Sequence, residues 1–211
     1  MPLLPQIAKT ILKIDSVTIP SERREILQPL VDYIREKVIK GSPVRLNFIC
    51  THNSRRSHLA QVWAQVMACH FGIDHVFCYS GGTESTALYP MVVETLRHSG
   101  FQIETLSGLQ NPVYVIKFSA NEPPIIGFSK VWDAHFNPQS KFAAVMTCAQ
   151  ADEACPYIAG AEARIPVTYE DPKHFDKSPL QAEKYAEKSL QIASEMHHVL
   201  SKIGEEFGKR N

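Results

Sequence analysis

The sequence predicts an α/β fold: a doubly wound, mostly parallel four-stranded sheet flanked by helices, with an N-terminal helical arm and an inserted β-hairpin. Short apolar runs of strand length alternate with segments whose apolar residues recur at helical spacing. Several of these runs also end directly at a reactive side chain, as expected where parallel strands gather ligand-binding groups at their carboxyl ends. The expected strands cover 45–49, 75–79, 101–105, 142–147 and 164–169, and the expected helices cover 21–40, 57–71, 88–98 and 179–203.

The first predicted units lie in the N-terminal half. In the segment 21–40, apolar residues that include Leu27, Leu30 and Ile34 repeat at helical spacing, and Gly41 can end the helix. The run 45–49 then leads directly into Cys50. After a polar loop the chain is again helical, with Leu59 and other apolar residues on one face. This region therefore reads as helix, strand, loop and helix.

The remaining units continue the alternation. Gly100 can close the helix 88–98, and a strand is expected directly after it. The run 142–147 consists mainly of small apolar residues and ends at Cys148, while the strand 164–169 is followed by Asp171. Cys50, Cys148 and Asp171 each follow a predicted strand, so we expect all three at one edge of the sheet.

The chain divides into an N-terminal helical extension, residues 1–43, and a domain over 44–208 with an insertion at about 109–141. Within the insertion, the runs 114–118 and 125–131 flank Pro123 and Pro124, which predicts a β-hairpin with a proline turn. We expect the extension to pack on the sheet; a dimer surface or a cover over the site is the alternative.

Composition excludes several classes of function. Lys+Arg and Asp+Glu both total 22 in 211 residues, so the formal charge is zero. The chain therefore lacks the excess of basic residues that is typical of proteins that bind nucleic acids or anionic membranes. No apolar run has the length of a membrane helix, and no secretory signal is visible. The odd number of cysteines favours free thiols in a reducing cytoplasm; they are Cys50, Cys69, Cys78, Cys148 and Cys155.

The segment from Cys50 to Ser57 has the pattern of an oxyanion-binding loop at a strand-to-helix junction. Five residues separate Cys50 from Arg56, so the loop can curl around a tetrahedral oxyanion and direct its backbone N–H groups inward. The same positive field favours the nucleophilic thiolate of Cys50, and the planar guanidinium of Arg56 suits two oxygens. Ser57 can donate its hydroxyl to the Cys50 sulfur. The expected oxyanion-binding residues are Thr51, His52, Asn53, Ser54 and Arg55.

Cys148 and Cys155 form a second group of thiols. Six residues separate them, so a disulfide between them requires the intervening segment to rearrange. A mobile segment near a reactive thiolate is what a resolving-cysteine relay needs. Two other interpretations remain open: a pair of metal ligands, for which the gap is wide, and two inert core thiols.

The dipeptide Asp171-Pro172 supplies a candidate acid. A carboxyl group at a strand end beside the loop can protonate a leaving oxygen as a general acid, and Pro172 restricts the turn that presents it. Asp-Pro pairs also initiate ordinary turns, which is the alternative interpretation.

Together these features resemble the thioredoxin-coupled arsenate reductases that share the low-molecular-weight protein tyrosine phosphatase fold. The resemblance covers about 44–108 and 141–205. It rests on Phe48-Ile49-Cys50-Thr51, Asn53-Ser54, Arg56-Ser57, Tyr79-Ser80-Gly81-Gly82, Cys148 with Cys155-Pro156, and Asp171-Pro172.

The resemblance implies a mechanism. Cys50 attacks arsenate, Arg56 and the loop amides hold the oxyanion, and Asp171 protonates the departing oxygen. Cys148 then attacks the Cys50–arsenic adduct, arsenite leaves, and Cys155 takes over the disulfide. A thioredoxin-like partner would reduce the Cys148–Cys155 bond, and neither a metal nor an organic cofactor is expected.

This chain departs from the family pattern at three positions. His52 stands where the family commonly has Gly, so the loop shape is open at that position. Arg55 adds a second positive charge to the loop. Gln61 replaces a Glu that some relatives link to a potassium site, so no metal is predicted.

Two other functions remain as alternatives. The first is a low-molecular-weight protein tyrosine phosphatase, in which Asp171 activates water against a phospho-Cys50 intermediate. Two features weigh against it. That family has the pattern Cys-x5-Arg-Ser-Pro, whereas here His58 follows Ser57. Aromatic residues usually follow its Asp-Pro pair, whereas here Lys173 and His174 follow. The second is a non-catalytic redox sensor that uses the same thiols to switch partner binding.

Overall fold

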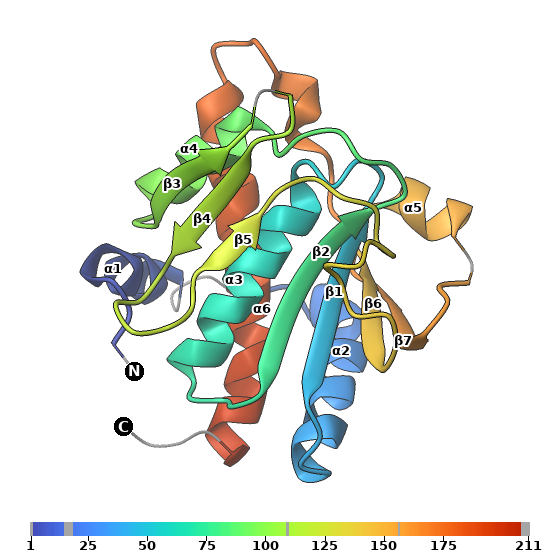
Figure 1. Ribbon diagram of the computed structural model, residues 1–211. Coiled ribbons are helices and arrows are strands. Elements are labelled where there is room, and N and C mark those ends of the chain that lie inside the picture. Colours follow the sequence, from blue (N-terminus) through green and yellow to red (C-terminus); the bar gives the residue numbers. More distant parts are fainter. Residues whose placement is uncertain (1, 15–18, 109, 156, 208–211) are drawn as a thin grey trace.

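The computed structural model of the chain describes residues 2–14, 19–108, 110–155 and 157–207 (Figure 1). Three expectations fall on positions outside these residues: the domain end at 208, the start of the insertion at 109, and Pro156. Among the described residues, no helix is long and apolar enough to cross a membrane.

Four parallel strands form the main sheet. They pair in the order β2-β1-β6-β7, so β1 is central and chain order differs from spatial order. Cys50, the last residue of β1, lies opposite Gly82 of β2, and Cys148 follows the adjacent β6. The strands are β1 (Val44–Cys50), β2 (Val76–Gly82), β6 (Phe142–Met146) and β7 (Ala161–Pro166).

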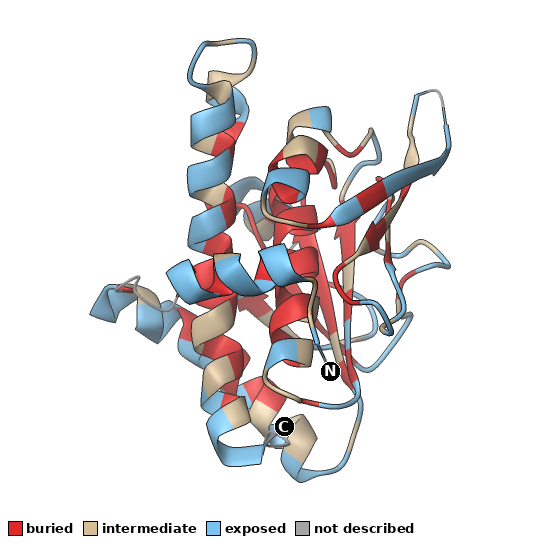
Figure 2. Ribbon diagram, turned by 90° about the vertical axis from the view of Figure 1, so that its left-hand side faces the viewer, coloured by how far each residue is buried: buried red, intermediate tan, exposed pale blue. Residues whose placement is uncertain are grey.

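Helices surround this sheet, which confirms the predicted fold class. Figure 2 shows that buried positions gather on the sheet and on the inward sides of the helices, as amphipathic patterns require. The helices are α1 (Pro5–Ile14), α2 (Ser21–Ile39), α3 (Arg56–His70), α4 (Pro90–His98), α5 (Ala149–Ala154), the 3-10 helix η1 (Pro172–Phe175) and α6 (Gln181–Phe207).

A second sheet is antiparallel and contains the inserted hairpin. It pairs β3 (Gln102–Ser107), β4 (Val113–Lys117) and β5 (Ile125–Gly127) in chain order. The hairpin is confirmed, with a second arm shorter than 125–131. The strand expected at 101–105 belongs to this sheet and not to the parallel one. Within β3 only Ile103 is buried, whereas a strand inside a parallel sheet is apolar on both faces.

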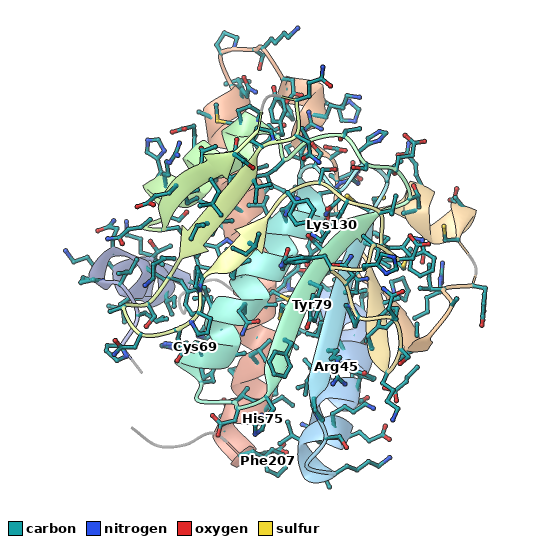
Figure 3. The ribbon with its side chains drawn as sticks, viewed as in Figure 1. Arg45, Cys69, His75, Tyr79, Lys130 and Phe207 are labelled. Carbon is teal, nitrogen blue, oxygen red and sulfur yellow. The ribbon has the colours of Figure 1, made fainter. Side chains whose placement is uncertain are left out.

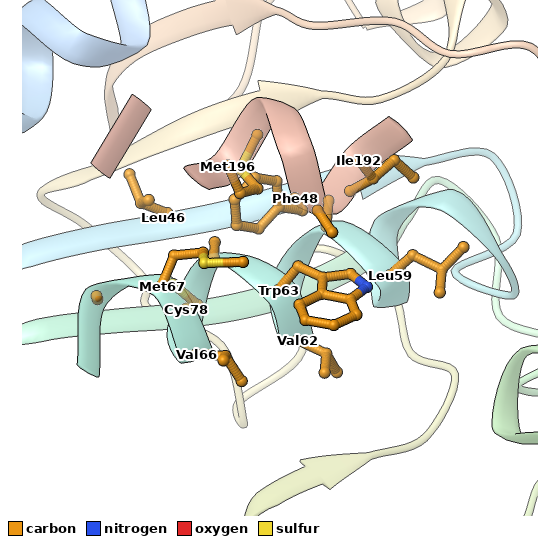
Figure 4. Close-up of a cluster of buried hydrophobic side chains, with 14 of the residues drawn as sticks. Leu46, Phe48, Leu59, Val62, Trp63, Val66, Met67, Cys78, Ile192 and Met196 are labelled. Atoms are coloured by element: carbon orange, nitrogen blue, oxygen red, sulfur yellow. The ribbon is translucent and has the colours of Figure 1, made fainter. Parts of the chain in front are cut away.

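The main core lies between β1, α3 and α6 (Figure 4). Trp63 of α3 is its largest buried side chain and meets Phe101 edge-to-face, with ring centroids 5.2 Å apart. The Trp63 indole N–H donates to Ser189 Oγ of α6 at 2.9 Å, so burial leaves no polar atom of the ring unpaired. Because α3 begins at the end of the Cys50 loop, this packing holds the helix that carries Arg56.

The N-terminal helices contribute to the same core. Ile7 and Ile11 of α1 and Leu27 of α2 are fully or almost fully buried within it. Arg23 of α2 also forms a two-pronged ion pair with Glu195 of α6, at 2.9 and 2.7 Å. Removal of residues 1–43 would therefore expose apolar surface and leave the Glu195 carboxylate without this partner.

The outer edge of β2 is closed by side-chain amides. Gln65 donates to Val76 O and accepts from Cys78 N, both at 3.0 Å, and Gln61 donates to Cys78 O. Farther along the strand, Asn137 donates to Ser80 O at 3.0 Å. An open strand edge offers unpaired backbone groups to other chains, and here these amides occupy them.

The insertion closes the remaining end of that edge and buries a lysine. Gly82 N donates to Lys130 O at 2.9 Å, and Figure 3 shows Lys130 beside the carboxyl end of β2. Lys130 is only 4% exposed, and its ammonium lies 4.5 and 5.3 Å from the ring centroids of Phe128 and Phe136. Burial lowers the Lys130 pKa from 10.5 to about 8.

Gln65→Met tests the closed edge. The substitution keeps the packing volume but leaves Val76 O and Cys78 N without their protein partner, so we expect a loss of about 1–2 kcal/mol in unfolding free energy. Urea denaturation measures it, with the exposed Gln28→Met as the matched control. Equal effects of the two substitutions would show that the amide does not stabilise the edge.

Lys130→Met tests the buried amine. Below pH 8 Lys130 is charged in both the folded and the unfolded chain, so the folded state carries the full desolvation penalty. Between pH 8 and 10.5 the unfolded state binds more protons than the folded state, so the stability of the wild type rises with pH. We expect the variant to be more stable than wild type by about 2 kcal/mol at pH 7. The gain should shrink as the pH rises through that window.

Urea denaturation at pH 7, 8, 9 and 10 measures this difference, and Lys9→Met on the exposed side of α1 is the control. A gain that does not change with pH, or a variant less stable than wild type at pH 7, would contradict the assignment.

Candidate active site

The loop after β1 begins at a buried thiol. Cys50 is 3% exposed, and its Sγ lies 3.1 Å from the hydroxyl of Ser57, which is in the first turn of α3. The predicted contact between Ser57 and the Cys50 sulfur is therefore present. A hydroxyl at this distance can donate to a thiolate and can stabilise it again when it departs.

Asn53 shapes the loop. Its φ of 44° lies in the left-handed region, which Asn tolerates better than most residues. Its amide nitrogen donates to Ser57 Oγ at 2.9 Å, and its amide oxygen accepts from Lys130 N at 3.0 Å. The left-handed residue is thus Asn53 and not His52, so the His52 substitution does not obstruct the turn.

Residues of the insertion form hydrogen bonds to the Cys50–Arg56 loop. Ser129 Oγ donates to His52 O at 2.9 Å, next to the contact between Lys130 and Asn53. From the other side, a Cβ at Gly82 would lie 2.7 Å from both Asn53 N and Thr51 O, so only glycine allows β2 to approach the loop this closely. The loop is held by segments from two distant parts of the chain.

Arg56 lies at the end of the loop, and two of its three guanidinium nitrogens are hydrogen-bonded within the protein. Its Nη1 donates to Tyr169 O at 2.9 Å and its Nη2 to Asp171 Oδ2 at 2.6 Å. Its Nε is buried and has no hydrogen-bond partner. Because an unpaired buried donor is unfavourable, this atom marks where an oxyanion would complete the site.

The Arg55 side chain turns away from the loop, contrary to the expectation that it adds charge inside it. Its Nε donates to Tyr185 Oη and its Nη2 to Asp176 Oδ2, each at 2.6 Å, and its guanidinium stacks over the Tyr89 ring at 4.1 Å. Arg55 therefore connects the loop to α6, to the residue after η1 and to the residue before α4. For an oxyanion it retains only its backbone N–H.

Asp171 follows β7 and lies directly beside Arg56. One carboxylate oxygen pairs with the guanidinium, and the other accepts from Lys173 N at 3.0 Å, which caps η1. The side chain remains 24% exposed. The carboxyl group is thus positioned at the same edge of the sheet as Cys50 and still reaches solvent.

Three of the five free thiols gather in one place. Cys50 and Cys148 are buried in a small cluster against which Cys155 also packs. Cys148 Sγ lies 3.4 Å from Thr51 Oγ1, the residue after Cys50. Cys69 and Cys78 belong instead to the main core, and burial raises the pKa of each. The predicted division between reactive and core thiols agrees with this placement.

A cleft of about 730 Å³ opens over the loop. Its walls carry four cationic side chains, those of Arg23, Arg56, Lys173 and Lys188, against two carboxylates, Glu170 and Asp171. The first residues of α5 form part of the wall. The cleft is lined by Arg23, Thr51, His52, Arg56, Ala149, Gln150, Thr168, Tyr169, Glu170, Asp171, Lys173, His174, Lys188 and Gln191. Such a lining suits a small, strongly anionic substrate.

Sequence reasoning missed several residues of this site. Arg23 and Lys188 reach the cleft from helices that carry no motif, and the Tyr169 carbonyl holds Arg56 through the backbone. Ser129 and Lys130 lie in the insertion, outside the recognisable pattern. A short polar pair between apolar runs was the only local signal for them.

The region around the Cys50–Arg56 loop is similar to a known protein family. A family model for low molecular weight phosphotyrosine protein phosphatase matches residues 45–114, which run from β1 through the loop into β4. No curated protein sequence shows significant similarity to the chain.

Solved structures with the same fold include several phosphatases. The low molecular weight phosphotyrosine phosphatase of Vibrio cholerae O395 aligns with a TM-score of 0.51 at 14% identity, covering 79% of this chain and 99% of that one. The low molecular weight protein tyrosine phosphatase of T. tengcongensis aligns with a TM-score of 0.50 at 16% identity, covering 75% and 99%. The arsenate reductase of Archaeoglobus fulgidus gives 0.48 at 16% identity, covering 74% and 98%.

At these identities the structural likeness concerns the fold. Residues 45–114, which include the Cys50–Arg56 loop, thus match the family model for low molecular weight phosphotyrosine protein phosphatase, and the chain shares the fold of the solved phosphatases.

Proposed function

We propose that this protein is a thiol-dependent arsenate reductase that uses Cys50 as the nucleophile and Cys148 and Cys155 as a disulfide relay. The observation that carries the proposal is the contact of Cys148 Sγ with Thr51 Oγ1 at 3.4 Å, in the same buried cluster as Cys50. Hydrolysis of a phosphate ester does not require a second thiol beside the nucleophile. A relay requires one there.

The first step is attack of the Cys50 thiolate on arsenate. A sulfur–arsenic bond forms, one arsenate oxygen departs, and Asp171 donates the proton that lets it leave as water. The loop N–H groups and Arg56 Nε hold the remaining oxygens. Ser57, 3.1 Å from the sulfur, stabilises the thiolate before attack.

The second step transfers two electrons to arsenic. The Cys148 thiolate attacks Cys50 Sγ, the sulfur–arsenic bond breaks, and its electron pair leaves with arsenic as arsenite. Cys155 then attacks Cys148 Sγ and releases the Cys50 thiolate, leaving a Cys148–Cys155 disulfide. A dithiol reductant of the thioredoxin type restores both thiols, which suits the reducing cytoplasm.

A phosphotyrosine phosphatase is the second candidate, favoured by the pairing of Arg56 with Asp171 and by the family match over residues 45–114. The cleft weighs against it. Among the described residues that line the cleft, Tyr169 supplies the only phenyl-type ring, and it is only 5% exposed. A phosphotyrosine ring would find charged and polar groups there instead of an aromatic surface.

The relay predicts a specific mutational pattern. Wild type should oxidise NADPH with arsenate, thioredoxin and thioredoxin reductase, while Cys50→Ser, Cys148→Ser and Cys155→Ser should each abolish multiple turnover, because each removes one sulfur of the relay. Cys69→Ser, which lies outside the cluster, should retain it. NADPH absorbance measures the rate.

The opposite pattern would identify a phosphatase. No arsenate-dependent turnover, with hydrolysis of p-nitrophenyl phosphate that survives Cys148→Ser, contradicts the reductase. Inactivity of wild type in both assays contradicts both enzymes and leaves a redox sensor.

The two loop arginines should differ in oxyanion binding. Arg56→Met removes a charged fork from the site, so affinity for inorganic phosphate should fall about 10- to 100-fold. Arg55→Met should change that affinity less than about threefold, because its side chain pairs with Tyr185 and Asp176. Isothermal titration measures both. A larger loss in Arg55→Met, with its fold intact by circular dichroism, would contradict the assignment.

A further inference from the structure

Arg164 of β7 grips the end of the helix that separates the two relay thiols. Its Nε donates to Cys155 O at 3.0 Å, and its Nη2 donates to Asp152 O and lies 2.5 Å from Asp152 Oδ1. The Asp152 carbonyl belongs to the last turn of α5, where helical C=O groups have no partner inside the helix, and Cys155 is the residue that follows the helix. One guanidinium therefore holds the carbonyl of Cys155 and both polar groups of Asp152.

Few other contacts hold α5 in place. The helix has six residues, too few to be stable by itself. Of these only Ala151 is buried, while Ala149, Gln150, Glu153 and Ala154 are exposed. Its first turn is closed by Ala151 N, which donates to Cys148 Sγ at 3.4 Å. The Arg164 contacts thus form a large share of what keeps this segment helical.

The helical segment is incompatible with a Cys148–Cys155 disulfide. Seven positions along an α-helix span about 10 Å, at about 1.5 Å per residue. A disulfide requires Cα atoms within about 4.4–6.8 Å. The end of α5 must therefore unwind before the bond forms, and Arg164 holds one carbonyl in the last turn and one directly after it.

We infer that Arg164 is a positioning residue whose grip on Asp152 and Cys155 stabilises the reduced, helical state of α5 and thereby sets the reduction potential of the Cys148–Cys155 pair. The inference rests on the proposed relay. Because these contacts favour the dithiol, they make the disulfide easier to reduce and so help a dithiol reductant to recycle the enzyme. Without them the disulfide should form more readily and be harder to reduce.

The test is the exchange of the full-length protein with oxidised dithiothreitol. The Cys148 and Cys155 thiols give up two electrons and two protons and become a disulfide, while the cyclic disulfide of dithiothreitol becomes its dithiol. Alkylation and peptide mass spectrometry measure the equilibrium constant. Arg164→Met should raise it about tenfold, because hydrogen bonds to a charged group are lost only from the reduced state.

Arg97→Met is the matched control, because Arg97 likewise binds a carboxylate, Glu94, and a backbone carbonyl, that of Ile103, away from the thiols. It should leave the constant unchanged. Arg164→Lys keeps the charge but not the fork and should resemble Arg164→Met. Asp152→Asn removes only the carboxylate and should shift the constant in the same direction by about threefold, which keeps the test open if Arg164→Met folds poorly.

Each outcome is decisive. If wild type forms the disulfide and Arg164→Met changes its equilibrium constant by less than twofold, the role of Arg164 is overturned and the relay stays intact. The same holds if Arg164→Lys has the wild-type constant. A disulfide that forms in Arg164→Met but not in wild type supports the inference. Absence of the disulfide from both proteins, also when the stronger oxidant glutathione disulfide replaces oxidised dithiothreitol, overturns the relay and the inference together.

Discussion

The side-chain amide of Asn53 is the interaction on which the candidate site depends. It joins the loop to α3 through Ser57, and so to the Cys50 sulfur, and it joins the same loop to the insertion through Lys130 N. Its left-handed backbone makes the turn that lets the loop curl. An apolar side chain at this position would leave the Ser57 hydroxyl free to rotate and the Lys130 N–H without its acceptor.

The guanidinium groups of the two loop arginines are largely occupied by partners within the protein. Arg55 serves the framework through Tyr185 and Asp176, whereas Arg56 is divided between the Tyr169 carbonyl and Asp171. A bound oxyanion would share the Arg56 guanidinium with Asp171, so the anion and the carboxylate would contact the same side chain. Two adjacent arginines of the same type thus have different tasks, which depend on the direction of each side chain.

Local patterns predicted what is local. The Cys50–Ser57 loop and the strand that precedes it follow from spacing and apolar runs in a short stretch of chain, whereas the place of Cys148 beside the loop follows from the parallel order of the strands. Contacts between distant segments did not follow: Arg23 meets Glu195 across 172 positions, and Arg55 meets Tyr185 across 130. The direction of the Arg55 side chain depends on such partners. The run 101–105 predicted a strand, but its sequence did not show that β3 pairs with β4 in a second sheet.

The strand order has a consequence for synthesis of the chain. β1 is central, but its neighbour β6 follows it by more than 90 residues in the chain, and the covering helix α6 is the last element made. Domains fold as units once their distant contacts can form. On the ribosome, the Cys50 thiol therefore becomes buried only after most of the chain has emerged.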